Sequence, residues 1–256
     1  MTALVRRHDP DRFLTALFAP SDRRDALMAL YAFNHELARA REVASQPMLA
    51  FMRLQWWREV VEGEEKRHEV ATPLRQAIAG GLLRAEDLLP IIEAREIEAE
   101  EDRIETLDGW RSWLWQGAGG LSVAAARLLG APDAETFRPY GAAYGGAGLL
   151  RTVPSLARQG RCLLPIEVLA REGLSPEIAI AAPDSAPLGR ILRELAAEVV
   201  GWLQNAPSRV RARSAVAAAL PAVLARRDLA RVPAPWQPRG LGARAAVVWA
   251  AVSGRI

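Results

Sequence analysis

The chain has little cysteine, and it has no long apolar run, and each shortage excludes a class of protein. Its 256 residues include one cysteine, Cys162, so neither a disulfide framework nor a cysteine-based metal site can form. No apolar run reaches the roughly 18–20 residues that a membrane-spanning helix needs. The first ten residues contain no hydrophobic stretch of signal-peptide length. We therefore expect a cytoplasmic protein.

β-Branched residues and aromatics are also few, whereas alanine dominates the apolar residues, and this composition favours helices. Apolar residues recur at spacings of three and four, and no strand-like alternation or long linker interrupts them. The sequence therefore predicts one all-α domain over residues 1–256. The main helices are expected from Ser21 to about Pro47 and over residues 48–62, 88–104, 107–115, 121–129, 137–153, 188–204, 210–224 and 242–252, with an extended connector at 232–238.

Lysine is nearly absent, since Lys66 is the only one, and the charges are unevenly distributed. Residues 59–108 hold 15 acids and 6 bases, whereas residues 185–256 hold 11 arginines and 3 acids. The two regions could pair within one fold, or the basic end could face an anionic membrane surface or nucleic acid. The simplest interpretation is that the arginines reflect a compositional bias of the genome.

Few side chains form a pattern with chemical meaning. The three histidines, His8, His35 and His68, match no metal-ligand spacing. Glu98, Glu101 and Asp102 share one face of an expected helix, where carboxylates could hold Mg²⁺. Because Arg95 and Arg103 are interleaved with the acids, a solvated and salt-bridged face is the preferred interpretation.

Three separate segments carry a family resemblance: Ala-Leu-Tyr-Ala-Phe at 29–33, Leu-Gln-Trp-Trp-Arg at 54–58, and Leu-Leu-Arg at 149–151 followed by Gly-Arg-Cys-Leu-Leu-Pro at 160–165. In this order and spacing the chain resembles the squalene/phytoene synthase family. The resemblance implies an isoprenoid synthase-like helical bundle around a central cavity. In that family, Asp-rich motifs on facing helices hold Mg²⁺, which binds the diphosphate of a prenyl substrate.

The chain departs from these Asp-rich motifs. Ala38 and Glu42 stand at degenerate positions of the first motif, and Thr152 and Leu156 at those of the second, with Pro154 expected to interrupt the helix. The resemblance thus implies no catalytic residue, no metal site and no cofactor. It leaves a vestigial substrate pocket bordered by Tyr31, His35, Arg151 and Arg161.

The segments at 33–38, 52–57 and 150–154 are similar to a non-catalytic branch of the family, whose mitochondrial member is an assembly factor for respiratory complex I. This narrower resemblance implies a protein that binds a partner protein, such as a subunit of a respiratory complex. It also implies a cavity that retains a lipid or prenyl ligand, and peripheral contact with the inner membrane. The alternative is an active head-to-head prenyltransferase of the squalene/phytoene synthase type. Its Mg²⁺ ligands would be unconventional, namely Glu42 with the acidic helix. A nucleic-acid partner is not expected, because no recognised binding motif is present.

Overall fold

The computed structural model describes residues 1–42, 44, 46–99, 104–234 and 237–256, and these residues are largely helical. The longer helices are α3 (Ser21–Glu42), α4 (Pro47–Glu62), α6 (Ala85–Ala99), α7 (Leu107–Gln116), α8 (Ala118–Leu128), α9 (Arg138–Arg158), α12 (Ala186–Asn205) and α15 (Leu241–Ser253). The shorter ones are α1 (Thr2–His8), α2 (Pro10–Ala16), α5 (Ala71–Ala79), α10 (Ile166–Arg171), α11 (Pro176–Ala181), α13 (Val216–Ala219) and α14 (Pro221–Leu229), with 3₁₀ turns η1 (Ala134–Phe137) and η2 (Arg213–Ala215). The predicted all-α class is confirmed.

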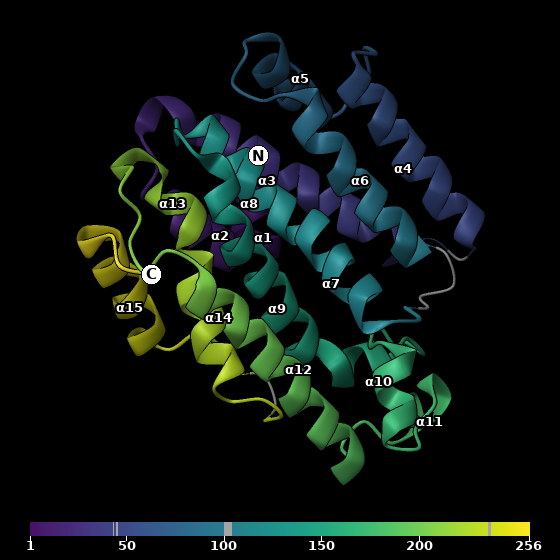
Figure 1. Ribbon diagram of the computed structural model, residues 1–256. Coiled ribbons are helices and arrows are strands. Elements are labelled where there is room, and N and C mark those ends of the chain that lie inside the picture. The colour runs from purple at the N-terminus through teal and green to yellow at the C-terminus, as the bar shows by residue number, and fades with distance from the viewer. Residues whose placement is uncertain (43, 45, 100–103, 235–236) are drawn as a thin grey trace.

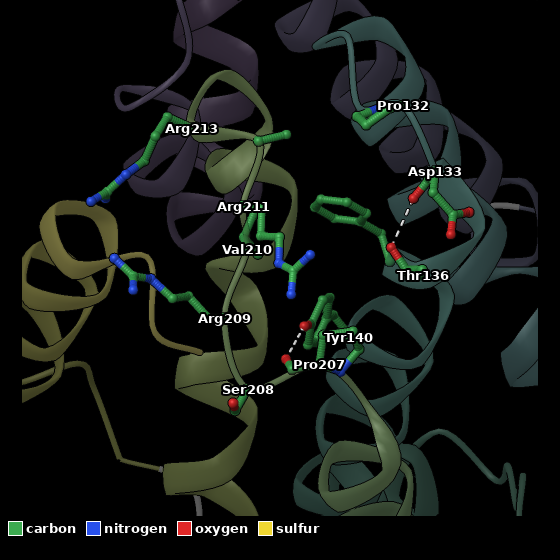
Figure 2. A pocket seen from close by; sticks show the side chains of 12 residues that line it. Pro132, Asp133, Thr136, Tyr140, Pro207, Ser208, Arg209, Val210, Arg211 and Arg213 are labelled. Carbon is green, nitrogen blue, oxygen red and sulfur yellow. Dashed lines mark hydrogen bonds between the residues drawn. The ribbon is translucent and has the colours of Figure 1, made fainter.

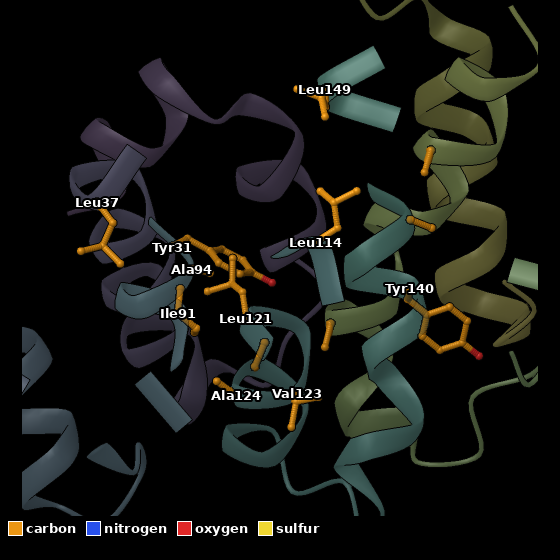
Figure 3. Close-up of a cluster of buried hydrophobic side chains, with 14 of the residues drawn as sticks. Tyr31, Leu37, Ile91, Ala94, Leu114, Leu121, Val123, Ala124, Tyr140 and Leu149 are labelled. Carbon is orange, nitrogen blue, oxygen red and sulfur yellow. The ribbon is translucent and has the colours of Figure 1, made fainter. Parts of the chain in front are cut away.

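Helix α9 lies at the centre of the bundle. It packs against α8, α12 and α14, while α4 and α5 pack on α3 and α6 at one side, and α15 lies at the opposite edge against α14 (Figure 1). Buried side chains from these helices form one hydrophobic core. Tyr31, Ile91, Leu121 and Tyr140 belong to it (Figure 3).

Glycines in α9 allow two helices to approach unusually closely. A β-carbon on Gly141 would lie 2.2 Å from the carbonyl oxygen of Ala118, and one on Gly145 would lie 2.4 Å from the Ala118 β-carbon. Glycine costs about 1 kcal/mol relative to alanine inside a helix. The close packing of α8 on α9 at Gly141 and Gly145 offsets this cost.

Proline 154 does not interrupt α9, so the expected end of the helix near Val153 is wrong. The helix continues through Pro154 to Arg158. Proline lacks the N–H that would bond to the carbonyl four residues earlier. Helix α9 nevertheless stays continuous, and it packs against α11, α12 and α14.

Other expected boundaries also differ. Pro47 begins α4, whereas α3 ends at Glu42. Ile104 is not helical but forms an isolated bridge with Pro165. Helix α8 runs through Gly119 and Gly120, although the helices expected at 107–115 and 121–129 left these glycines out. Glycine is needed at position 119 because a β-carbon there would meet Arg138 at 2.9 Å.

The two C-terminal predictions were too simple. The helix expected over 210–224 is an irregular segment followed by η2, α13 and α14, with Pro221 in the first turn of α14. The connector expected to be extended at 232–238 instead forms a turn up to residue 234, and residues 235–236 lie outside the described part.

Candidate functional site

A cavity of about 920 Å³ opens between α3, α6, α8 and α9 and is also lined by residues of the segments 6–14 and 238–244. Both helices of the degenerate motifs reach it, since Asn34 comes from α3 and Gly148, Arg151 and Thr152 come from α9. The lining is basic. It contains six arginines, Arg6, Arg12, Arg95, Arg151, Arg239 and Arg244, against the two acids Asp9 and Asp11.

Arg239 ties the C-terminal segment to two carboxylates at this cavity. Its Nη2 donates to Asp11 Oδ2 and to Asp228 Oδ2, each at 2.7 Å. Arg151 Nη1 donates to the same Asp228 oxygen at 3.0 Å. Burial alone would lower the pKa of Arg239, but its hydrogen bonds to Asp228 and Asp11 raise the pKa above the ordinary value. We call Asp11, Asp228, Arg151 and Arg239 the arginine–aspartate cluster.

Aromatic side chains flank the arginine–aspartate cluster. The Tyr144 hydroxyl donates to Asp11 Oδ2 at 3.2 Å. The guanidinium carbon of Arg12 lies 4.8 Å from the centre of the Tyr144 ring and 5.6 Å from that of Tyr31. Burial raises the pKa of both tyrosines, so both hydroxyls stay protonated at neutral pH.

The acidic helix α6 supplies the counterion of another cavity arginine. Arg95 Nη1 donates to Glu98 Oε1 at 2.6 Å, and Arg95 Nη2 donates to Asn34 Oδ1 at 3.3 Å. Glu98 is buried, contrary to the solvated face that was expected. The expected salt bridges are present, since Arg58 pairs with Glu96 at 2.8 Å and with Glu93 at 3.7 Å. Glu101, Asp102 and Arg103 lie outside the described residues.

The remaining sequence-predicted residues are spread over several places. Of the pocket residues, only Arg151 lines the cavity itself. Tyr31 is buried beneath Arg12, and the His35 ring stacks on His8 of α1 at 4.4 Å. Arg161 and Glu42 line a second pocket of about 480 Å³ beside Cys162. The structure therefore does not bring the four predicted pocket residues together in one pocket, and their binding role stays a prediction.

Of the four degenerate positions, only Glu42 carries the carboxylate that Mg²⁺ prefers, and it lines the second pocket instead of the cavity. Ala38 is half-buried, and Leu156 packs against the core. Thr152 Oγ1 donates to the carbonyls of Gly148 and Leu149 in its own helix, at 2.9 and 3.0 Å. Within the described ranges, no group of three or more histidine, cysteine or acidic side chains could hold a metal ion. The residues present do not fit a magnesium cluster of the kind that the family motifs build.

Asp11, Asp228 and Arg239 were missed by sequence reasoning because they lie far apart in the chain. Arg239 and Asp11 are separated by 228 positions. One signal was available, since Asp228 is the only acidic residue after Glu198, in a region rich in arginine. A lone carboxylate in such a region is a candidate for a buried ion pair.

His35 is expected to make stability depend on pH. Burial and the adjacent His8 lower its pKa, and its Nε2 has no hydrogen-bond partner within the described part of the chain. The unfolded chain therefore binds a proton more readily than the folded one below a pH of about 6.5. Stability should fall as the pH decreases through this range. Replacing His35 with glutamine should reduce that fall, as measured by thermal unfolding between about pH 8 and 5.5. An unchanged pH dependence in this variant would contradict the assignment.

The helical bundle with its central cavity defines an isoprenoid synthase-like fold. A solved dehydrosqualene synthase in complex with ligand superimposes with a TM-score of 0.79 over 98% of this chain and 94% of the other, at 15% identity. A squalene synthase from Alicyclobacillus acidocaldarius gives 0.67 over 98% and 92%, at 19% identity. The family model described as squalene/phytoene synthase matches residues 5–247. The chain therefore belongs to the squalene/phytoene synthase family.

Curated relatives fall into two groups. The chain is 26% identical over 228 residues to NADH dehydrogenase (ubiquinone) complex I, assembly factor 6 of Mus musculus, covering 86% of this chain and 68% of the other. The Homo sapiens counterpart is 24% identical over 212 residues, and the matched region covers 80% of this chain and 64% of that protein. A 15-cis-phytoene synthase of Pantoea ananas is 27% identical over 215 residues, covering 76% of this chain and 68% of the other.

Proposed function

We propose that this chain is a non-catalytic member of its family that acts as an assembly factor for a respiratory complex by binding a partner protein. The observation that carries the proposal is the replacement of the metal-binding carboxylates by Ala38, Thr152 and Leu156. The two acids that line the cavity are already paired, because Asp9 binds Arg12 and Asp11 binds Arg239. The named assembly factors among its relatives support the same role.

Catalysis of prenyl condensation needs more than a basic cavity. The diphosphate departs with concentrated negative charge, and catalysis requires cations that stabilise this charge more in the transition state than in the ground state. Arginines that bind the ground state equally well would hold the substrate without accelerating its reaction. The carboxylates that would position metal ions for the leaving group are missing at positions 38, 152 and 156.

The same cavity supports binding of an anionic lipid or prenyl diphosphate without turnover. Its volume suits a chain-like ligand, and Arg151 Nε is a buried donor without a hydrogen-bond partner among the described residues. Native mass spectrometry of gently purified protein is expected to show a bound lipid or prenyl species. Repeated preparations with no such adduct would contradict this part of the proposal.

The assembly role is tested by deleting the gene in the source organism. We expect less fully assembled complex I on native gels stained for NADH oxidation, with restoration by the wild-type chain. A T152A variant is a matched control for the cavity. It should restore assembly equally well, because the Thr152 hydroxyl is bonded within its own helix. Normal complex I in the deletion strain would overturn the proposed role.

The non-catalytic part is tested separately with purified protein. Farnesyl or geranylgeranyl diphosphate, supplied with Mg²⁺, is expected to remain unconsumed. Formation of squalene, phytoene or a presqualene-type intermediate would overturn the non-catalytic assignment and favour an active prenyltransferase.

A further inference from the structure

Helix α15 presents an apolar face to solvent at the edge of the molecule (Figure 1). Ala243, Val247 and Ala250 are buried on its inner face, and α15 packs against α14. On the outer face Trp249 is 67% exposed and Val252 is 66% exposed, and Leu241 and Val248 are exposed beside them. These four residues recur at helical spacing and form a continuous stripe. An exposed apolar stripe that includes a tryptophan marks an interaction surface.

Arginines lie around this apolar stripe, and several of them belong to a segment that is hydrogen-bonded to the end of α15. The 207–213 segment is fixed to the C-terminus, because Val210 N donates to the Gly254 carbonyl at 2.8 Å and Ile256 N donates to the Ser208 carbonyl at 3.1 Å. Arg213 Nη1 donates to the carbonyl of Val252. Exposed Arg209 and Arg255 complete the rim.

Figure 2 shows the pocket of about 840 Å³ on the other side of the 207–213 segment. Arg211 extends toward Tyr140, while Arg209 lies nearer to α15. Asp133 is the acidic residue in the lining, on the opposite wall. Arginines of this segment therefore lie both in the pocket lining and at the α15 edge.

The charge of this region is one-sided. Residues 206–256 contain nine arginines and a single acid, Asp228. Asp228 is already bound to Arg151 and Arg239, so it does not neutralise the exposed arginines of the rim. The C-terminal segment that carries α15 is therefore strongly positive, as an anionic partner requires.

We propose that the α15 face is a docking surface for an anionic phospholipid bilayer. An apolar helical stripe can enter the boundary between headgroups and acyl chains while arginines bind the lipid phosphates. Tryptophan is favoured at this depth because its ring is apolar and its N–H is polar. The 13 residues of α15 give a length of about 20 Å, too short to cross a hydrocarbon core, so the helix would lie in the membrane plane. Among the described residues, no helix has the length and apolarity for a membrane span.

Two other occupants fit the surface less well. A second copy of the chain would bring the positive rims of two α15 helices together, and like charges at close range repel. Nucleic acid would satisfy the arginines but would leave the apolar stripe exposed to water. A bilayer of anionic lipid satisfies both parts of the surface. This inference concerns a surface separate from the central cavity and does not depend on the proposed function.

Co-sedimentation with lipid vesicles tests the proposal on the full chain. The wild-type protein is expected to bind vesicles of phosphatidylcholine mixed with phosphatidylglycerol, to bind pure phosphatidylcholine weakly, and to be released by added salt. The variant W249S/V252S should bind the mixed vesicles about tenfold less tightly. The variant R209Q/R255Q should lose about tenfold or more.

Two matched controls distinguish binding through this surface from nonspecific binding to vesicles. Met48 and Met52 of α4 are 66% and 62% exposed, so M48S/M52S removes a comparable apolar area elsewhere. R53Q/R67Q removes the same charge from other exposed arginines. Both controls should bind like the wild type, and circular dichroism should show equal thermal stability for all variants.

Three results would overturn the proposal. The wild type could remain in the supernatant with mixed vesicles, or the α15 variants could bind as tightly as the controls. The third is a dimer, detected by light scattering, that W249S/V252S dissociates while no vesicle binding occurs. That result would assign the face to a second copy of the chain.

Discussion

Replacing Arg239 with methionine is expected to lower the free energy of unfolding by about 3–5 kcal/mol, because Asp11 and Asp228 lose their shared guanidinium in a nearly buried setting. Methionine keeps most of the side-chain volume, so the loss reports charge pairing rather than packing. The midpoint and slope of urea denaturation measure it. The C-terminal segment should also become more accessible to proteases, since Arg239 links it to α2 and α14.

Arg190 provides the matched control for this prediction. It pairs with Glu172 at 2.6 Å, but the Arg190 side chain is 53% exposed and that of Glu172 is 31% exposed. R190M should therefore change the free energy of unfolding by less than about 1 kcal/mol. The double variant D11N/R239M should recover part of the loss, because Asp228 keeps Arg151 as its partner and no carboxylate at this place then lacks one. A cost for R239M no larger than that of R190M would contradict the structural role of the arginine–aspartate cluster.

Replacing Gly141 with alanine is expected to cost about 3 kcal/mol or more, because the new methyl group would overlap α8. Its β-carbon would lie 2.2 Å from the Ala118 carbonyl oxygen and 2.5 Å from the Ser122 β-carbon. Neither neighbour can rotate away, so the two helices must separate. Thermal and urea unfolding measure the loss.

The same substitution at Gly148 is expected to have the opposite sign. Gly148 lies in the same helix, but nothing stands within 4 Å of its β-carbon position. G148A should therefore stabilise the protein by about 0.5–1 kcal/mol, because alanine is the better helix former. Equal effects of G141A and G148A would show that helix propensity dominates over the close approach of α8 and α9.

Local sequence patterns predicted the longer helices well, because the apolar stripe of each helix recurs every three or four residues within one short segment. Helix α7 begins at Leu107 and α15 ends one residue beyond the expected Val252. Boundaries failed where packing overrides propensity. Gly119 and Gly120 lie inside α8, and Pro154 lies inside α9, because neighbouring helices hold these segments in place.

The candidate site was only partly predictable. The degenerate positions Ala38, Thr152 and Leu156 could be read directly, because the absence of a carboxylate is a property of the residue itself. Arg151 was expected at the cavity and lines it. The partners of Arg151 were not predictable, because Asp228 has no local spacing that relates it to α9. The sequence also could not predict that Arg161 and Arg151 lie in two different pockets.

The sequence by itself determined the helical class, the family resemblance and the missing metal ligands, because composition, local periodicity and residue identity need no knowledge of distant contacts. Only the tertiary structure decided which charges meet. Arg239 closes the cavity by binding Asp11 across 228 positions, and the arginines of residues 207–213 join the exposed face of α15. Such pairings depend on how the helices pack, and packing brings together residues that no local pattern relates.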